Sequence, residues 1–143
     1  MSEGHGTFAT ALNCMDGRTQ IPVIEWVKKE FHVDYVDTIT EPGIDAVLAS
    51  GNEGGEKSVD EWQGILRDSV RRRIGISTGK HLSKAIVIVG HDGCAGNPVD
   101  KEQHLVHIRS AVDLVKSWVA SEITVLGLWC APDDSGNWQV TKI

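Results

Sequence analysis

Two short segments of this sequence carry side chains that commonly bind metals and move protons. Cys14, Asp16 and Arg18 alternate along the first segment, and His91 and Cys94 lie three residues apart in the second. Each segment follows an apolar run of the kind that forms a buried strand. Side chains alternate between faces along an extended chain, so the three groups of the first segment are expected to point the same way.

The chemistry of the two cysteines and the histidine suits zinc. Thiolate and imidazole are the ligands that zinc prefers, and Gly93 and Gly96 give the second segment the freedom to turn His91 and Cys94 toward one ion. Together with Cys14 they supply three protein ligands and leave a fourth position, which is the pattern of a catalytic zinc site.

Asp16 and Arg18 leave two arrangements open. Asp16 can occupy the fourth zinc position and close the site. Alternatively, the planar guanidinium of Arg18 can hold the Asp16 carboxylate through two hydrogen bonds, away from the metal. Asp16 would then accept a hydrogen bond from a zinc-bound hydroxide and orient it.

The two segments together resemble the β-class carbonic anhydrases, with Cys-x-Asp-x-Arg at 14–18 and His-x-x-Cys at 91–94. The resemblance covers residues 7 to about 143. It implies zinc on Cys14, His91 and Cys94, with Asp16 and Arg18 as the catalytic pair. It also implies reversible hydration of CO2 to bicarbonate by a zinc-bound hydroxide, in a homodimer or larger homo-oligomer.

Two features predict a small, divergent member of that family. About six residues precede the first strand, where the family usually has a helical arm. The stretch at 38–43, Thr-Ile-Thr-Glu-Pro-Gly, replaces an Arg-Asn-Ala-Gly-like segment near the active site. Two alternatives to CO2 hydration therefore stay open: hydrolysis of carbonyl sulfide or carbon disulfide at the same zinc site, and a non-catalytic zinc-binding module.

The elements that must position these groups follow from apolar periodicity. A helix is expected from about Pro22 to Phe31, a short one over 44–49, a third in which Trp62 leads an apolar stripe, and a fourth capped by Asp100. Strands are expected at 7–14, 34–40, 85–90, 123–130 and 137–143.

This alternation predicts the α/β class. The expected architecture is a single domain over residues 1–143, with residues 1–6 as a flexible tail. Its sheet has four mostly parallel strands flanked by helices, and a C-terminal antiparallel edge strand. Ligands of such a sheet bind beyond the carboxyl ends of its strands, where both segments begin.

Other candidate ligands have simpler interpretations. His104 and His107 are three residues apart on a helix, and we interpret them as part of a solvated face. Cys130 ends a strand, and we interpret it as a buried apolar filler.

Composition limits the remaining functions. The net charge is −6, which disfavours nucleic-acid binding because that needs a basic face. The sequence shows neither a secretory leader nor a run of about 18 apolar residues for a membrane span. A cytoplasmic location is therefore expected as the default. Three cysteines are an odd number, which favours metal binding or catalysis over a disulfide framework.

Overall fold

The computed structural model describes residues 6–52 and 61–143. The expected flexible tail therefore lies, apart from residue 6, outside the described residues. Five strands form one sheet in the order β2-β1-β3-β4-β5. Their bounds are Phe8–Asn13 for β1, Tyr35–Thr40 for β2, Ala85–His91 for β3, Thr124–Pro132 for β4 and Trp138–Lys142 for β5. The first four strands run parallel and β5 is antiparallel to β4, as predicted.

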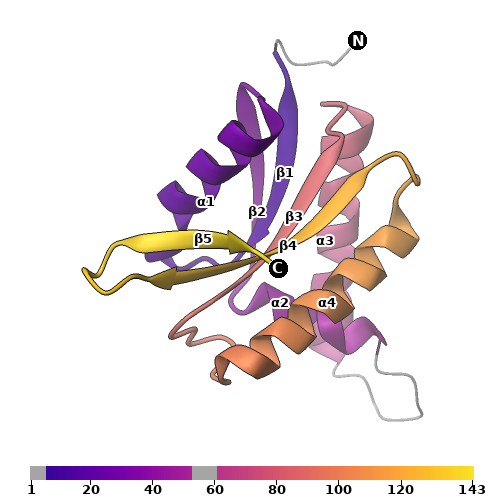
Figure 1. Ribbon diagram of the computed structural model, residues 1–143. Coiled ribbons are helices and arrows are strands. Elements are labelled where there is room, and N and C mark those ends of the chain that lie inside the picture. Colours follow the sequence, from indigo (N-terminus) through magenta and orange to yellow (C-terminus); the bar gives the residue numbers. More distant parts are fainter. Residues whose placement is uncertain (1–5, 53–60) are drawn as a thin grey trace.

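The helices cover the sheet on two faces (Figure 1). Their bounds are Gly17–Phe31 for α1, Ile44–Ala49 for α2, Glu61–Gly79 for α3 and Lys101–Trp118 for α4, and a single 3-10 turn follows α2 at Ser50–Asn52. Helix α1 lies on one face, and α2, α3 and α4 lie on the other (Figure 1). Both faces of the central strands are therefore buried.

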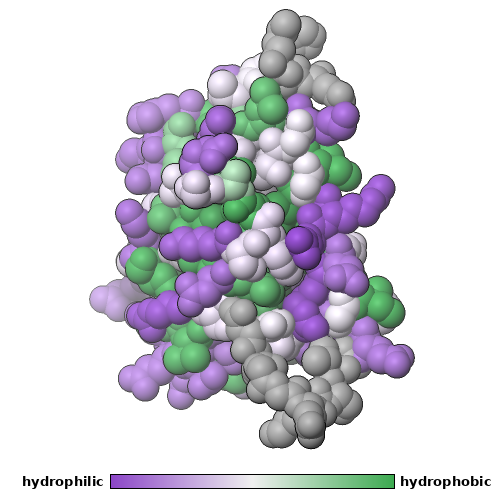
Figure 2. All heavy atoms as spheres, turned by 90° about the vertical axis from the view of Figure 1, so that its right-hand side faces the viewer, coloured by the Kyte–Doolittle hydropathy of each residue, from purple (hydrophilic) through white to green (hydrophobic). Residues whose placement is uncertain are grey.

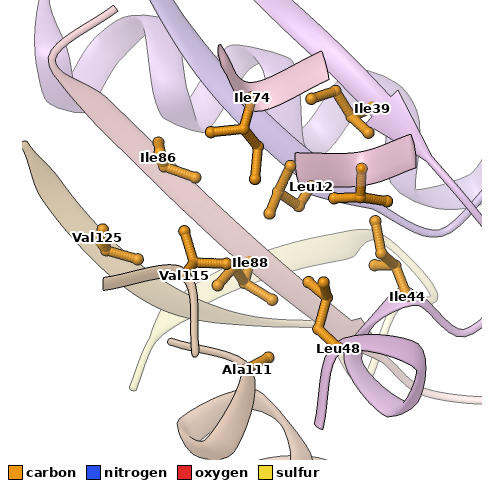
Figure 3. Close-up of a cluster of buried hydrophobic side chains, with 11 residues drawn as sticks. Leu12, Ile39, Ile44, Leu48, Ile74, Ile86, Ile88, Ala111, Val115 and Val125 are labelled. Atoms are coloured by element: carbon orange, nitrogen blue, oxygen red, sulfur yellow. The ribbon is translucent and has the colours of Figure 1, made fainter. Parts of the chain in front are cut away.

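Strand β3 shows why the sheet has two cores. All seven of its residues are buried. Ile86 and Ile88 point into the core beneath α2, α3 and α4, whereas Val87 and Val89 point into the core beneath α1. Figure 3 shows the first of these cores, where Ile86 and Ile88 lie among apolar side chains of the three helices. A strand buried on both faces needs such a continuous apolar run.

Helix α1 begins earlier than the sequence predicts, at Gly17 instead of near Pro22. Asp16 is its N-cap and accepts a hydrogen bond from the backbone N–H of Arg18. Pro22 lies inside the helix, where its ring removes one backbone hydrogen bond. The expectation of an extended chain through Arg18 was therefore wrong, because the Asp16 cap starts the helix directly after the strand.

Several large apolar side chains of the described residues are exposed, among them Met15, Ile21 and Trp62. On the face that Figure 2 presents, hydrophobic residues lie scattered among hydrophilic ones. Scattered single apolar side chains are normal on a protein surface. Within residues 6–52 and 61–143, no helix has the length and apolar character needed to cross a membrane.

Candidate metal centre

The candidate ligands meet at the point where the strand order of the sheet reverses. Strand β1 lies between β2 and β3, so the chain proceeds to one side of β1 and later to the other. Cys14 follows the end of β1, and His91 is the last residue of β3. After β1 and after β3 the chain continues toward opposite sides of the sheet, which leaves a crevice at the carboxyl ends of these two strands. Ligands bind in such a crevice in sheets of this kind.

Three donor atoms converge in this crevice. The sulfurs of Cys14 and Cys94 and a ring nitrogen of His91 all lie within 4.8 Å of one another, and all three residues are buried. The two sulfurs are 3.9 Å apart. Two sulfurs bound to one tetrahedral zinc at about 2.3 Å each would lie about 3.8 Å apart. The cysteine pair therefore already has the spacing that zinc requires.

The imidazole of His91 is oriented for the same point. Its Nδ1 lies 2.8 Å from the backbone carbonyl oxygen of Asp92 and donates a hydrogen bond there. Because Nδ1 makes this contact, Nε2 is the ring nitrogen left to bind a metal. Nε2 is buried and has no hydrogen-bond partner among the described residues. A buried polar atom without a partner is costly, and a metal ion would satisfy it.

The two cysteines differ in their ionisation. Burial alone would raise the pKa of Cys14, but the His91 imidazole and the backbone N–H groups of Gly43 and Asp16 lower that pKa to about 7. Burial, together with the nearby Cys14 charge, raises the pKa of Cys94 to about 11. At neutral pH the Cys94 sulfur therefore keeps its proton, which binding of a divalent ion would release.

Asp16 is held away from these donors by Arg18. The Arg18 side chain donates from Nε to Oδ1 at 3.0 Å and from a terminal nitrogen to Oδ2 at 2.7 Å. The same nitrogen donates to the carbonyl oxygen of Gly93 at 3.1 Å, which ties the pair to the loop of Cys94. The Arg18 guanidinium lowers the pKa of the Asp16 carboxyl to about 2. The structure thus contains the Arg18–Asp16 pair that one of the two arrangements requires, and Asp16 is not among the three converging donors.

Side chains of the first turns of α1 hold the segment between Cys14 and α1 in place. The Gln20 side-chain nitrogen donates to the carbonyl oxygens of Cys14 and Asp16, at 2.7 and 2.8 Å. The Thr19 hydroxyl donates to the Asn13 side chain at 3.2 Å and to the Asp16 carbonyl at 2.9 Å. These contacts hold the turn that joins the strand to the helix, and with it the positions of the sulfur and the carboxylate.

Sequence reasoning missed Trp138 of β5. Its ring lies 4.8 Å from the centre of the Arg18 guanidinium, and its centroid lies 6.2 Å from that of the His91 ring. Because β5 pairs with the end of β4, it brings this tryptophan across the crevice. In the sequence, a single tryptophan after a turn gives no sign that it will contact Arg18 and His91.

The remaining candidates divide into one confirmed and one corrected interpretation. Cys130 is fully buried and lies outside the donor cluster, as the interpretation of a buried filler predicts. Burial and the nearby Asp16 charge raise its pKa to about 11, so it stays a neutral thiol. The interpretation of His104 as part of a solvated face was wrong. It is 1% exposed, because it bonds to the equally buried Asp45 at 2.6 Å.

Comparisons with known proteins agree with this geometry. Residues 4–143 match the model of a family described as "Putative carbonic anhydrase". Among solved structures, the chain resembles a carbonic anhydrase from Streptococcus mutans with a TM-score of 0.56 at 15% identity, covering 94% of this chain and 80% of that one. It also resembles a β-carbonic anhydrase from Trichomonas vaginalis with a TM-score of 0.53 at 16% identity, covering 94% and 81%. At such identities the structural likeness establishes the fold. A comparison with proteins of curated function found no match.

Proposed function

The chain belongs to the carbonic anhydrase family that its sequence matches over residues 4–143, and on that premise we propose that it hydrates CO2 reversibly to bicarbonate with zinc. The observation that carries this proposal is the convergence of two buried sulfurs and an unpartnered imidazole nitrogen. Cys14, His91 and Cys94 would hold the zinc. When bound in such a site, zinc acts as a Lewis acid that makes water a nucleophile near neutral pH.

Asp16 and Arg18 are the proposed catalytic pair. A carboxylate whose pKa is about 2 keeps no proton at neutral pH, so Asp16 serves as a hydrogen-bond acceptor that orients the attacking water. Arg18 keeps that carboxylate from moving onto the metal. Its two bonds to Asp16 and its bond to the Gly93 carbonyl support this role, since together they fix the direction of both oxygens.

The substrate, the oligomeric state and the cellular location of the protein are also proposals. The substrate is a small molecule, CO2 in one direction and bicarbonate in the other. The resemblance to the β-class enzymes leads us to propose a homodimer or larger homo-oligomer, which sedimentation equilibrium would test. Cys14, Cys94 and Cys130 are all free thiols, which supports a reducing, cytoplasmic location.

The experiment that tests the function is stopped-flow CO2 hydration at mildly alkaline pH on protein of known zinc content. A rate well above that of buffer, abolished by chelation of the metal and restored by zinc, is expected. Release of sulfide from carbonyl sulfide or carbon disulfide, with little CO2 hydration, would replace the proposed substrate. Full zinc occupancy with no turnover of any of the three substrates would identify a non-catalytic zinc module and refute the proposal.

Two cysteine variants make the ligand assignment specific. Cys94→Ser is expected to lose zinc and activity together, because a neutral hydroxyl is a poor replacement for a thiolate ligand. Cys130→Ala removes an equally buried thiol outside the donor cluster and is the matched control. It should keep both. Equal losses of zinc in the two variants would contradict the assignment.

A further inference from the structure

A buried polar cluster lies beside the candidate metal centre and has no part in the chemistry described above. Asp45 of α2 and His104 of α4 are each 1% exposed, and Asn97 is 5% exposed. The Nδ1 atom of His104 lies 2.6 Å from one carboxylate oxygen of Asp45. The side-chain nitrogen of Asn97 donates to both oxygens of that carboxylate at 3.2 Å. We call these three residues the Asp45 cluster.

The Asp45 cluster joins two backbone segments that touch each other. A Cβ atom built on Gly43 would lie 2.6 Å from the carbonyl carbon of Gly96, and one built on Gly96 would lie 2.5 Å from the backbone of Pro42. Gly43 also has a left-handed φ of +59°. Only glycines allow so close an approach at these two points. Asp45 follows the first segment and Asn97 ends the second, so their side chains bind the segments together.

These two segments supply hydrogen bonds to both cysteine sulfurs. The backbone N–H of Gly43 donates to the sulfur of Cys14. The backbone N–H groups of Gly96 and Asn97 donate to the sulfur of Cys94. Hydrogen bonds from the backbone hold a ligand sulfur in one position and orientation, and loss of such outer-shell partners weakens the binding of the metal.

The Asp45 carboxylate also lies close to strand β3, at the residue before His91. A Cβ atom on Gly90 would lie 3.0 Å from a carboxylate oxygen of Asp45, and Gly90 directly precedes His91. The Asp45 carboxylate therefore packs against the backbone of β3 one residue before the His91 imidazole.

Stability alone is a weak reason for such a cluster. The Nε2 atom of His104 is buried and has no hydrogen-bond partner among the described residues. A buried polar group without a partner is destabilising, and apolar side chains of similar volume would commonly fill the space at no loss of stability. The cluster is therefore better explained by what it positions than by what it contributes to folding.

We propose that Asp45, Asn97 and His104 are positioning residues that hold the backbone N–H donors on the sulfurs of Cys14 and Cys94, and so set the affinity of the metal centre. This inference rests on the proposed metal site. Among the described residues, no hydrogen bond joins the side chains of the cluster to Cys14, His91 or Cys94. It acts through the Gly43 and Gly96–Asn97 backbone.

The test compares Asp45→Asn with a control of similar burial. Asp45→Asn removes the negative charge at nearly constant shape, and it should weaken zinc binding about 10- to 100-fold in competition with a chelator, as loss of an outer-shell partner does. Thr10→Val is the control. Thr10 is fully buried and bonds to the hydroxyls of Ser77 and Ser83, away from the cysteines. The Thr10→Val variant should have a lower unfolding temperature but an unchanged zinc affinity.

Two further measurements separate positioning from a general loss of structure. In protein loaded with an NMR-active cadmium isotope, scalar coupling from the ion to the amide protons of Gly43 and Asn97 is expected and should disappear in Asp45→Asn. Combining Asp45→Asn with Asn97→Asp exchanges the amide and the carboxylate, and it should restore part of the zinc affinity. His104→Gln keeps a donor to Asp45 and is the milder variant if Asp45→Asn fails to fold.

The outcomes distinguish the proposed zinc-dependent function from the positioning role of the Asp45 cluster. If the unaltered chain binds no zinc, the proposed function fails. If it binds zinc and hydrates CO2, but Asp45→Asn and His104→Gln bind zinc as tightly as the unaltered chain, only the positioning inference is overturned. Equal loss of affinity in Thr10→Val would also overturn it, because zinc binding would then follow stability alone.

Discussion

Replacement of Arg18 by alanine tests the central feature of the proposed mechanism. In the structure, the Arg18 side chain makes two hydrogen bonds to Asp16, at 3.0 and 2.7 Å, and one to the Gly93 carbonyl at 3.1 Å. The variant removes all three and leaves the donor residues Cys14, His91 and Cys94 unaltered. Zinc should stay bound, while the Asp16 carboxylate becomes free to move onto the metal.

The first expected magnitude is the pKa of Asp16. Arg18 lowers that pKa from the ordinary value of 3.8 to about 2. In Arg18→Ala it should return toward 3.8. Arg18→Lys should give an intermediate value, because an ammonium group supplies charge but cannot hold both oxygens in one plane. A carboxyl titration by NMR on the metal-free protein measures all three.

The effect on stability has a definite sign. The pKa of Asp16 is lower in the folded chain than its ordinary value, so ionised Asp16 stabilises the fold above about pH 3.8. This stabilisation is lost as the pH falls through about 2. The difference in stability between the unaltered chain and Arg18→Ala should therefore shrink across that window. Urea unfolding of the metal-free proteins at a series of pH values measures it.

The second expected magnitude is catalytic. Loss of the pair should lower CO2 hydration about 10- to 100-fold, because Asp16 would no longer be held in the position from which it orients the water. Zinc affinity should rise if Asp16 becomes a fourth ligand, and adding Asp16→Asn to Arg18→Ala should abolish that rise. Full activity in Arg18→Ala, or an unchanged pKa of Asp16, would refute the reasoning.

Three other substitutions test packing near the site and in the core, and a fourth, at Gly136, is a control for the first of them. Gly43→Ala should destabilise the fold by more than the roughly 1–2 kcal/mol of a left-handed residue, because its Cβ meets backbone at 2.6 Å. Gly136→Ala, with φ of +83° and open space, should cost only the conformational part, and urea unfolding compares the two. Trp138→Leu removes the ring 4.8 Å from Arg18 and should lower CO2 hydration about 2- to 30-fold at unchanged zinc content. Ile88→Ala, at a fully buried position, should cost about 2–5 kcal/mol of unfolding free energy, and a loss below that range would mean that the core closes around the gap.

Much of the fold could be predicted because its signals are local. The run Ala85–Gly90 is apolar without interruption, which identifies a strand buried on both faces. The alternation of such runs with helical patterns predicts a parallel sheet. The start of α1 could not be placed from apolar spacing, since it depends on the cap that Asp16 makes with the N–H of Arg18. Pro22 is the sixth residue of the helix, but proline is typical of the first turn, so the sequence predicts a helix that begins too late.

The candidate ligands themselves could be identified from the sequence alone. Cys14, His91 and Cys94 are unusual residue types at the ends of two apolar runs, and the Arg18 side chain is close enough in sequence to reach Asp16. Their chemistry is independent of the rest of the fold. The sequence thus determined which groups could bind a metal, and which pair could control access to it.

Only the tertiary structure decided how these groups meet and what surrounds them. The donors converge because β1 lies beside β3, a pairing that joins distant parts of the chain. Asp45 bonds to Asn97 and His104 across 52 and 59 residues, and Trp138 reaches Arg18 from the last strand. Side-chain type and local spacing carry no record of such contacts. They arise when apolar faces pack together, and the polar groups left inside must then find partners among whatever residues the packing brings close.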